Sequence, residues 1–200
     1  MIVGEKMKLA EMGKLSIGFT LARIEAKPGE AFQEFELFTM QELTKETGNY
    51  GAEVEVQVVQ VSEKRIKDLI LSRAGMVLIG LTSYKAFVIT KDYENRIIPA
   101  NFAYLECYDH IDPNYVAWYF NEHPHIQKQL ILAMQGSILR SLPVQMLREF
   151  QLNSPDFETQ RKLGSMYRLN VKREKLLLEK QKLEELLMNQ VMIHYLKEEK

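Results

Sequence analysis

The longest regular pattern of apolar and polar positions lies at the C-terminal end of the chain, where leucines recur on one side of a run of helix-forming residues. Ser154, Pro155 and Asp156 supply a capping side chain, a proline suited to the first turn and a negative charge that the helix dipole favours. No proline occurs after them, and Gly164 is the only later glycine. The pattern predicts a helix over residues 156–200, a rod of about 60 Å at 1.5 Å per residue.

The apolar side of this helix has an imperfect heptad repeat. Leu169, Leu176 and Leu183 are seven residues apart, but charged residues such as Lys172 and Lys180 interrupt the other core positions. A helix longer than its own domain must bury its apolar side elsewhere, because packing supplies most of the stability of helices in proteins. We therefore expect a partner helix; the alternative is a terminal helix that folds back on its own domain. Four residues continue the apolar side: Leu186, Leu187, Val191 and Ile193.

The preceding part of the chain contains short segments with the spacing of strands. Residues 53–58 alternate valines with polar residues, which predicts a half-buried strand with its core on the valine side. Apolar runs at 76–79 and 86–89 predict two buried strands joined by an exposed connection. Further strands are expected at 16–24 and 102–107, and helices at 66–73, 113–121, 124–134 and 144–149. The sequence thus predicts an α+β fold with a β-rich domain at 1–153 and a long helix at 154–200.

The charge of the chain is balanced overall but not along its length. Apolar residues make up 46% of the chain, which suits a globular protein, and 26 Lys and Arg against 27 Asp and Glu give a net charge of −1. Any site for a polyanion must therefore be local. Residues 25–63 are acidic, whereas residues 64–96 hold seven bases against Asp68, Asp92 and Glu94. We expect the second segment to be electropositive.

A single cysteine and the lack of long apolar runs bear on the cellular compartment. Cys107 has no cysteine to pair with, which excludes an internal disulfide and a cysteine-based zinc cluster and fits a reducing cytoplasm. No apolar run approaches the roughly 20 residues that span a bilayer, and no leader-like N-terminal segment is visible. We expect a cytoplasmic protein that does not enter a membrane.

Two short motifs are candidates for a catalytic or a metal site. Asp112-Pro113-Asn114-Tyr115 is similar to the Asp/Asn-Pro-Pro-Tyr tetrapeptide of adenine amino-methyltransferases, but its third position differs, and a helix start explains the same residues. No glycine-rich loop for S-adenosylmethionine accompanies it. Two imidazoles, those of His123 and His125, could face a metal, but no third ligand lies at helical spacing, and a polar turn is the alternative. We expect a protein without catalytic residues or a cofactor.

A family resemblance rests on a glycine-serine segment and on the residues that come after it. The segment carrying it is Gly136-Ser137-Ile138-Leu139-Arg140-Ser141-Leu142, with Leu147, Phe150 and Leu152 beyond it, and then Pro155, Glu158 and Gln160 at the opening of the long helix. Together these residues resemble the DNA-specificity subunits of type I restriction-modification enzymes. Residues 8–11 with 17–20, 73–79 and 111–116 extend the resemblance in the same order along nearly the whole chain.

The resemblance implies a target-recognition domain that grips double-stranded DNA, with a spacer helix after it that sets a distance. Members usually carry two such units in tandem with antiparallel spacer helices, and methyltransferase subunits dock on that pair and supply the cofactor chemistry, with a restriction subunit as a possible further partner. This chain has one unit, so the resemblance implies a two-fold symmetric homodimer. The alternative is a coiled-coil adaptor or inactive relic that does not bind DNA. The expected dimer interface is Leu169, Leu176, Leu183, Leu187 and Ile193.

Residues that face DNA are expected in polar loops that combine basic, amide and aromatic groups. The alternative for each of them is an ordinary solvated loop, and Tyr50 or Tyr84 could instead cap the core. The recognised bases depend on side-chain placement in the groove, which the sequence does not give. The expected DNA-contacting residues are Lys45, Asn49 and Tyr50, then Thr82, Ser83, Tyr84 and Lys85, and finally Arg140 beside the glycine-serine turn.

Overall fold

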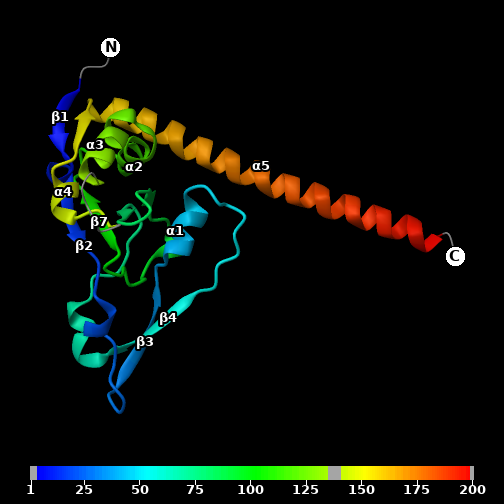
Figure 1. The fold of residues 1–200 in the computed structure, drawn as a ribbon, viewed down its shortest axis with the longest axis horizontal. Coiled ribbons are helices and arrows are strands. Elements are labelled where there is room, and N and C mark those ends of the chain that lie inside the picture. Colours follow the sequence, from blue (N-terminus) through cyan, green and yellow to red (C-terminus); the bar gives the residue numbers. More distant parts are fainter. Residues whose placement is uncertain (1–3, 135–140, 199–200) are drawn as a thin grey trace.

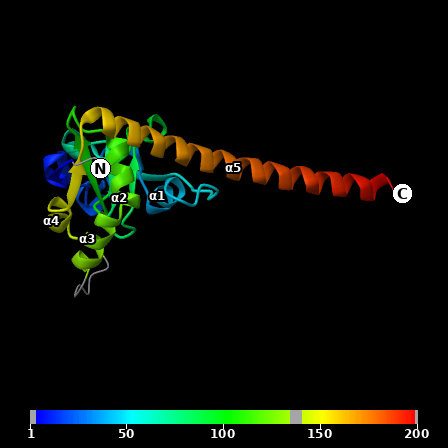
Figure 2. The same ribbon diagram turned by 90° about the horizontal axis from the view of Figure 1, so that it is seen from above.

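A long helix leaves a globular body and continues well beyond it (Figures 1 and 2). The computed structural model describes residues 4–134 and 141–198. The long helix is α5, Phe157–Glu198, with 42 residues. Its predicted start is confirmed to within one residue: Asp156 precedes the first turn, and its carboxylate accepts hydrogen bonds from the backbone N–H and the hydroxyl of Thr159. The α+β architecture predicted from the sequence is confirmed as well.

The centre of the body is a four-stranded antiparallel sheet in the order β2-β7-β5-β6. These strands are β2 (Gly13–Ile17), β7 (Phe102–Cys107), β5 (Val77–Gly80) and β6 (Ala86–Val88). Alternate residues face opposite sides. Val77 and Ile79 join the core beneath α2 (Pro113–Glu122) and α3 (Pro124–Met134), whereas Leu78 joins the core beneath α1 (Met40–Glu46). The runs at 76–79, 86–89 and 102–107 are therefore strands, as predicted.

A short two-stranded sheet closes the body next to the start of α5. Its strands are β1 (Glu5–Lys8) and β8 (Gln151–Ser154), which pair antiparallel with Glu5 opposite Ser154. Between β7 and β8, the predicted helices at 113–121, 124–134 and 144–149 are confirmed as α2, α3 and α4 (Val144–Arg148). The first and last strands of the body are thus neighbours at the base of α5 (Figure 1).

The strand predicted at 53–58 is wrong in both its position and its buried face. The strand is β4 (Gln57–Ser62), which pairs antiparallel with β3 (Phe32–Leu37). Val59 and Val61 are buried in a cluster with Ile97, whereas Val56 and Val58 are 52% and 53% exposed. Alternation fixes the period of a strand, but pairing with β3 and contact with Ile97 decide which face is buried.

Two further predictions need correction. The helix expected at 66–73 is only a short 3-10 helix, Glu63–Asp68, because the chain beyond it pairs with a neighbouring segment: Leu71 forms a β-bridge with Ile97, and the N–H of Ser72 donates to the carbonyl of Arg96. The strand expected at 16–24 begins earlier, at Gly13 in β2, and ends at Ile17. Residues Leu21–Arg23 then form a 3-10 helix.

In the part of the chain that the structure describes, no helix combines the length and apolar character needed to cross a bilayer.

Candidate nucleic-acid interface and pairing helix

The first turns of α5 are fixed to the body along α2. Gln160 is 2% exposed; its side-chain oxygen accepts from the N–H of Asp112 (3.1 Å), and its amide donates to the carbonyl of Pro155 (2.9 Å). One turn later, Gly164 lies against the start of α2, where a Cβ would be 2.2 Å from Oδ1 of Asp112 and 2.8 Å from the backbone N of Tyr115. The only glycine of the long helix is therefore required by a close approach between two helices.

Gly164→Ala tests this packing, because helix propensity and packing predict opposite signs. Propensity alone would stabilise an exposed helix position by about 1 kcal/mol, whereas overpacking costs about 1–3 kcal/mol. We expect a lower melting temperature in thermal unfolding followed by circular dichroism. Arg161→Ala, at an exposed position of the same helix, is the matched control and should change the melting temperature little. A higher melting temperature for Gly164→Ala would contradict the close approach.

A side-chain amide connects the exposed edge of the central sheet to α5. Asn121 of α2 accepts from the N–H of Ala86 and donates to its carbonyl, both at 2.7 Å, so it pairs with edge strand β6 as a further strand would. The same amide donates to the hydroxyl of Tyr167 on α5 at 2.8 Å. Burial raises the pKa of Tyr167, so its hydroxyl stays protonated. The orientation of α5 is thereby coupled to the sheet.

The loop after α1, which holds three of the predicted DNA-contacting residues, packs against the middle of α5. The hydroxyl of Tyr50 donates to Glu174 (3.1 Å), and the ammonium of Lys175 lies 5.6 Å from its ring centre. Burial, and after it the neighbouring Glu174, raises the pKa of Tyr50. Lys45 is half-buried beside a cavity of about 290 Å³ that Tyr50 also lines, and Asn49 is exposed. Tyr50 thus holds the loop to α5.

The second predicted group is the turn between β5 and β6. Gly80 donates to the carbonyl of Lys85 (2.9 Å), and Tyr84 adopts a φ of 55° within the turn. Thr82 is exposed, while Ser83, Tyr84 and Lys85 are half-buried. The N–H of Leu142 donates to the carbonyl of Leu81 (2.8 Å), so the end of the glycine-serine segment lies beside this turn. Arg140 itself lies outside the described residues.

Four of the seven bases in the segment predicted to be electropositive form ion pairs, three of them with acids from outside the segment. Arg96 forms ion pairs with Glu36 and with buried Glu42. Arg73 pairs with Glu106 at 2.6 Å. Lys64 and Arg65 also have acidic partners at 3.5 and 3.9 Å. Neighbouring carboxylates thus offset the charges of four of the seven bases, and the electropositive character of the segment stays a prediction.

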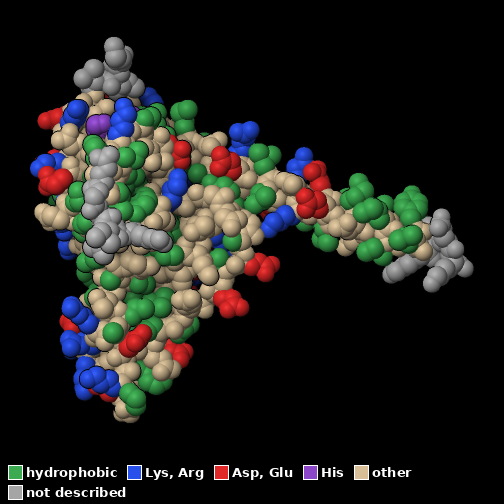
Figure 3. All heavy atoms as spheres, viewed as in Figure 1, with side chains coloured by type: hydrophobic (Ala, Val, Ile, Leu, Met, Phe, Trp, Pro, Cys, Tyr) green, Lys and Arg blue, Asp and Glu red, His purple; other side chains and the backbone are tan. Residues whose placement is uncertain are grey.

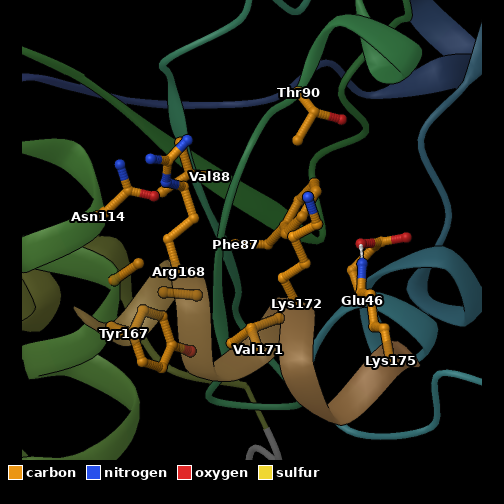
Figure 4. Close-up of a pocket in the computed structure, with 12 residues that line it drawn as sticks. Glu46, Phe87, Val88, Thr90, Asn114, Tyr167, Arg168, Val171, Lys172 and Lys175 are labelled. Carbon is orange, nitrogen blue, oxygen red and sulfur yellow. Dashed lines mark hydrogen bonds and ion pairs between the residues drawn. The ribbon is translucent and has the colours of Figure 1, made fainter. Parts of the chain in front are cut away.

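A row of cations on α5, which includes one of the residues that interrupt the heptad, borders a cavity. Arg168, Lys172 and Lys175 succeed each other at helical spacing and lie on one side of α5. They line one side of a cavity of about 340 Å³, and Phe87 and Val88 of β6 are part of its apolar lining (Figure 4). Lys175 is paired with Glu46 of α1. Arg168 and Lys172 are exposed and available to an anion.

The leucines predicted to form the dimer interface are exposed along α5, and all but Leu169, which also borders the body, lie on a side lined by α5 residues alone. We call Leu169, Leu176, Leu183 and Leu187 the seam; each is 53–60% exposed. The last three line a shallow groove on the helix together with Glu179 and Lys180. Ile193 is equally exposed, at 53%, but it lies about 120° around the helix from Leu187 at 3.6 residues per turn. The seam is thus an apolar surface without a partner in the described chain.

Both candidate chemical motifs have structural roles. Asp112 caps α2 by accepting from the N–H of Tyr115 (2.8 Å), with Pro113 in the first turn, which confirms the interpretation as a helix start. His123 stacks on Tyr119 with 4.0 Å between ring centres, and burial lowers the pKa of His123. Among the described residues, no group of three or more His, Cys, Asp and Glu side chains is placed to hold a metal ion.

The sequence matches no protein-family model and no curated protein. The fold, however, matches solved structures. The first is a chain from a structure on complex assembly and conformational transition of the type I restriction-modification system: the TM-score is 0.61, the identity 16%, and the match covers 95% of this chain and 48% of that one.

Two further structures are the HsdS subunit from Thermoanaerobacter tengcongensis and the S subunit of a type I restriction-modification system from M. genitalium. Their TM-scores are 0.55 and 0.56, with identities of 13% and 14%. The matches cover 88% and 90% of this chain, but only 39% and 41% of those subunits. The chain therefore has the fold of type I S subunits and spans less than half of the length of each matched chain.

Proposed function

We propose that the chain is a half S subunit: a non-catalytic, sequence-specific DNA-binding subunit that works in the cytoplasm as a homodimer. Its body reads one half of a bipartite DNA site, and α5 sets the distance between two bodies. Methyltransferase subunits would dock on the paired helices and supply the chemistry, and a restriction subunit is a further proposed partner. The observation that carries the proposal is the match to S subunits over most of this chain but less than half of theirs.

The proposed DNA surface combines the two predicted loops with the cations of α5. Arg168 and Lys172 lie on one side of the helix close to β6, whose preceding turn contains Thr82, Ser83 and Lys85. Exposed guanidinium and ammonium groups on a rigid helix are suited to phosphate contacts, which fix the position of a protein on DNA. Asn49 and Thr82, both exposed, are the proposed groups for base edges.

Salt titration of DNA binding tests the function and this surface together. Affinity should fall linearly with salt on logarithmic scales, with a slope of about 0.9 per neutralised phosphate. Arg168→Ala/Lys172→Ala should weaken binding to all sequences and lower the slope by about four phosphates per dimer, since each copy loses two cations and each cation neutralises one phosphate. Lys162→Ala, on another side of α5 and paired with Glu158, is the matched control. Binding should be measured with the homodimer, alone and with methyltransferase subunits.

Each outcome separates the alternatives. A chain that pairs and captures methyltransferase subunits, but with them shows no salt-dependent DNA binding, would be an adaptor and would overturn the proposal. An unchanged slope for the double variant, with normal binding, would remove the cations of α5 from the surface and leave the two loops as candidates.

A further inference from the structure

The free end of α5 is apolar around its whole circumference. Between residues 186 and 196 there is no Asp, Glu, Lys or Arg, and eight of the eleven side chains are apolar and 40–71% exposed. At 3.6 residues per turn, these side chains leave no arc wider than about 100° without an apolar group. We call residues 186–196 the apolar tip. Figure 3 shows hydrophobic side chains gathered at this end. The eight are Leu186, Leu187, Met188, Val191, Met192, Ile193, Tyr195 and Leu196.

A single partner helix cannot cover such a surface. In a two-stranded pair, each helix buries a narrow apolar stripe, as the seam does with Leu176 and Leu183, and the rest of its circumference faces solvent. Helices that are apolar on all sides are buried on more than one side. The charged stretch before the tip, residues 172–185, fits a two-stranded pair; the tip needs a second covering surface.

Antiparallel pairing through the seam determines what lies beside the tip. If Leu176 of one copy lies opposite the partner's Leu183, each step towards the C-terminus of one helix is a step towards the N-terminus of the other. The tip then lies beside residues 163–173 of the partner. This is the part of α5 that rests on the body, since Gly164 lies against the start of α2 and Tyr167 accepts a hydrogen bond from Asn121 of α2.

A groove runs along this part of α5 on the side opposite the row of cations. Its volume is about 900 Å³, and α5, α2 and the loop after α1 all contribute to it. Trp118 of α2 and Leu163 of α5 are half-buried in its wall, and Met166 and Leu169 are 67% and 60% exposed along its edge. Glu122 of α2 stands at its rim. The groove thus offers an apolar wall next to the helix surface that the tip would meet.

We propose that the apolar tip of each copy binds in this groove on the partner, between the partner's α5 and α2. The inference rests on the proposed antiparallel pair and adds to it a contact between the helix of one copy and the body of the other. One side of the tip packs on α5 of the partner, and the adjoining side packs on Trp118 of the partner subunit and the loop after α1. The contact occurs twice by symmetry, so at each end of the helix pair one body contacts both helices.

Cysteine crosslinking in the full chain tests this contact. Glu122→Cys places a thiol at the groove rim, and Met192→Cys places one on the tip, which projects away from its own body. A short bismaleimide should convert the double variant into crosslinked dimers. The matched control pairs Met192→Cys with Asn114→Cys, which lies beside the cations on the other side of α5, and should crosslink weakly. Burial raises the pKa of Cys107 to about 12, so little of the native thiol is in the reactive thiolate form.

A second variant measures the energetic weight of the tip. Met188→Glu/Met192→Glu leaves the seam intact but should raise the dissociation constant of the dimer about a hundredfold or more, because four apolar contacts are lost per dimer. Sedimentation equilibrium measures the change.

The outcomes distinguish the tip contact from the pairing itself. A parent chain that is monomeric overturns the proposed dimer. A dimer that fails to crosslink between positions 122 and 192, or a tip variant with unchanged dimer affinity, overturns the tip contact alone. A tip variant that dimerises normally but no longer binds methyltransferase subunits would assign the tip to that partner and would likewise overturn the contact.

Discussion

The double variant Leu176→Glu/Leu183→Glu should be monomeric at tens of micromolar, where the parent chain should be dimeric. Both leucines are more than half exposed, and they line the groove on α5 that faces away from the body. Burying a leucine contributes about 1.5–3 kcal/mol, and two-fold symmetry makes four such side chains, so the dimer dissociation constant should rise by about 10⁴-fold or more. Light scattering or sedimentation velocity measures the mass directly.

The control for this variant is Gln181→Glu, which adds a carboxylate to the same stretch of α5 on another side. It should remain a dimer and should show the same helix content as the parent. Monomeric parent protein at these concentrations, or a double variant that stays dimeric, would show that the seam does not pair two copies.

Repeating residues 176–182 once, directly after Lys182, should lengthen the gap in the recognised DNA site by about three base pairs. Seven added residues extend a helix by about 10 Å and nearly preserve the phase of the seam, and base pairs are spaced by about 3.4 Å. The repeat begins after Lys182, whose ammonium donates to the carbonyl of Gly51, so it preserves this contact between α5 and its body. A binding selection with methyltransferase subunits should return the same two half-sites with the longer gap.

Because the proposed pair is symmetric, the parent should select an interrupted palindrome of two equal half-sites. Inserting two residues instead of seven rotates the seam by about 200° at 100° per residue, so this control should lose the dimer and the bipartite site. Recovery of the original gap from the seven-residue variant, or asymmetric sites from the parent, would show that the paired helices do not set the distance.

The elements that the sequence predicted well are those whose burial depends on the segment itself. Residues 102–105 of β7 alternate between two cores, with Ala103 and Leu105 in one and Phe102 and Tyr104 in the other, so the pattern did not have to indicate which face is buried. Helix α2 has its own cap and proline. The prediction for residues 53–58 was wrong for the opposite reason. Pairing with β3 and contact with Ile97 decide which face of β4 is buried, and the local pattern does not contain that information.

The candidate DNA site was less predictable, because tertiary contacts redistribute polar groups between surface and scaffold. Tyr50 has the character of a loop aromatic available to a nucleic acid, but its hydroxyl and ring are engaged by α5. Lys172 interrupts the heptad in the sequence and, with Arg168, borders a cavity against β6 in the fold. The helical spacing of these cations was a usable signal, but it acquires meaning only once the side of α5 that rests on the body is known.

The pairing of β1 with β8 decides which chain ends would meet in the proposed dimer. Glu5 lies opposite Ser154, immediately before α5 begins, so the amino end of the described chain is at the base of the long helix. In the proposed dimer, Leu196 of one copy reaches the base of α5 in the other. A linker of a few residues would then suffice to fuse two copies into one polypeptide without altering either fold. After fusion, the two domains would no longer share one sequence. Each could then change independently, and the joined protein could read two different half-sites.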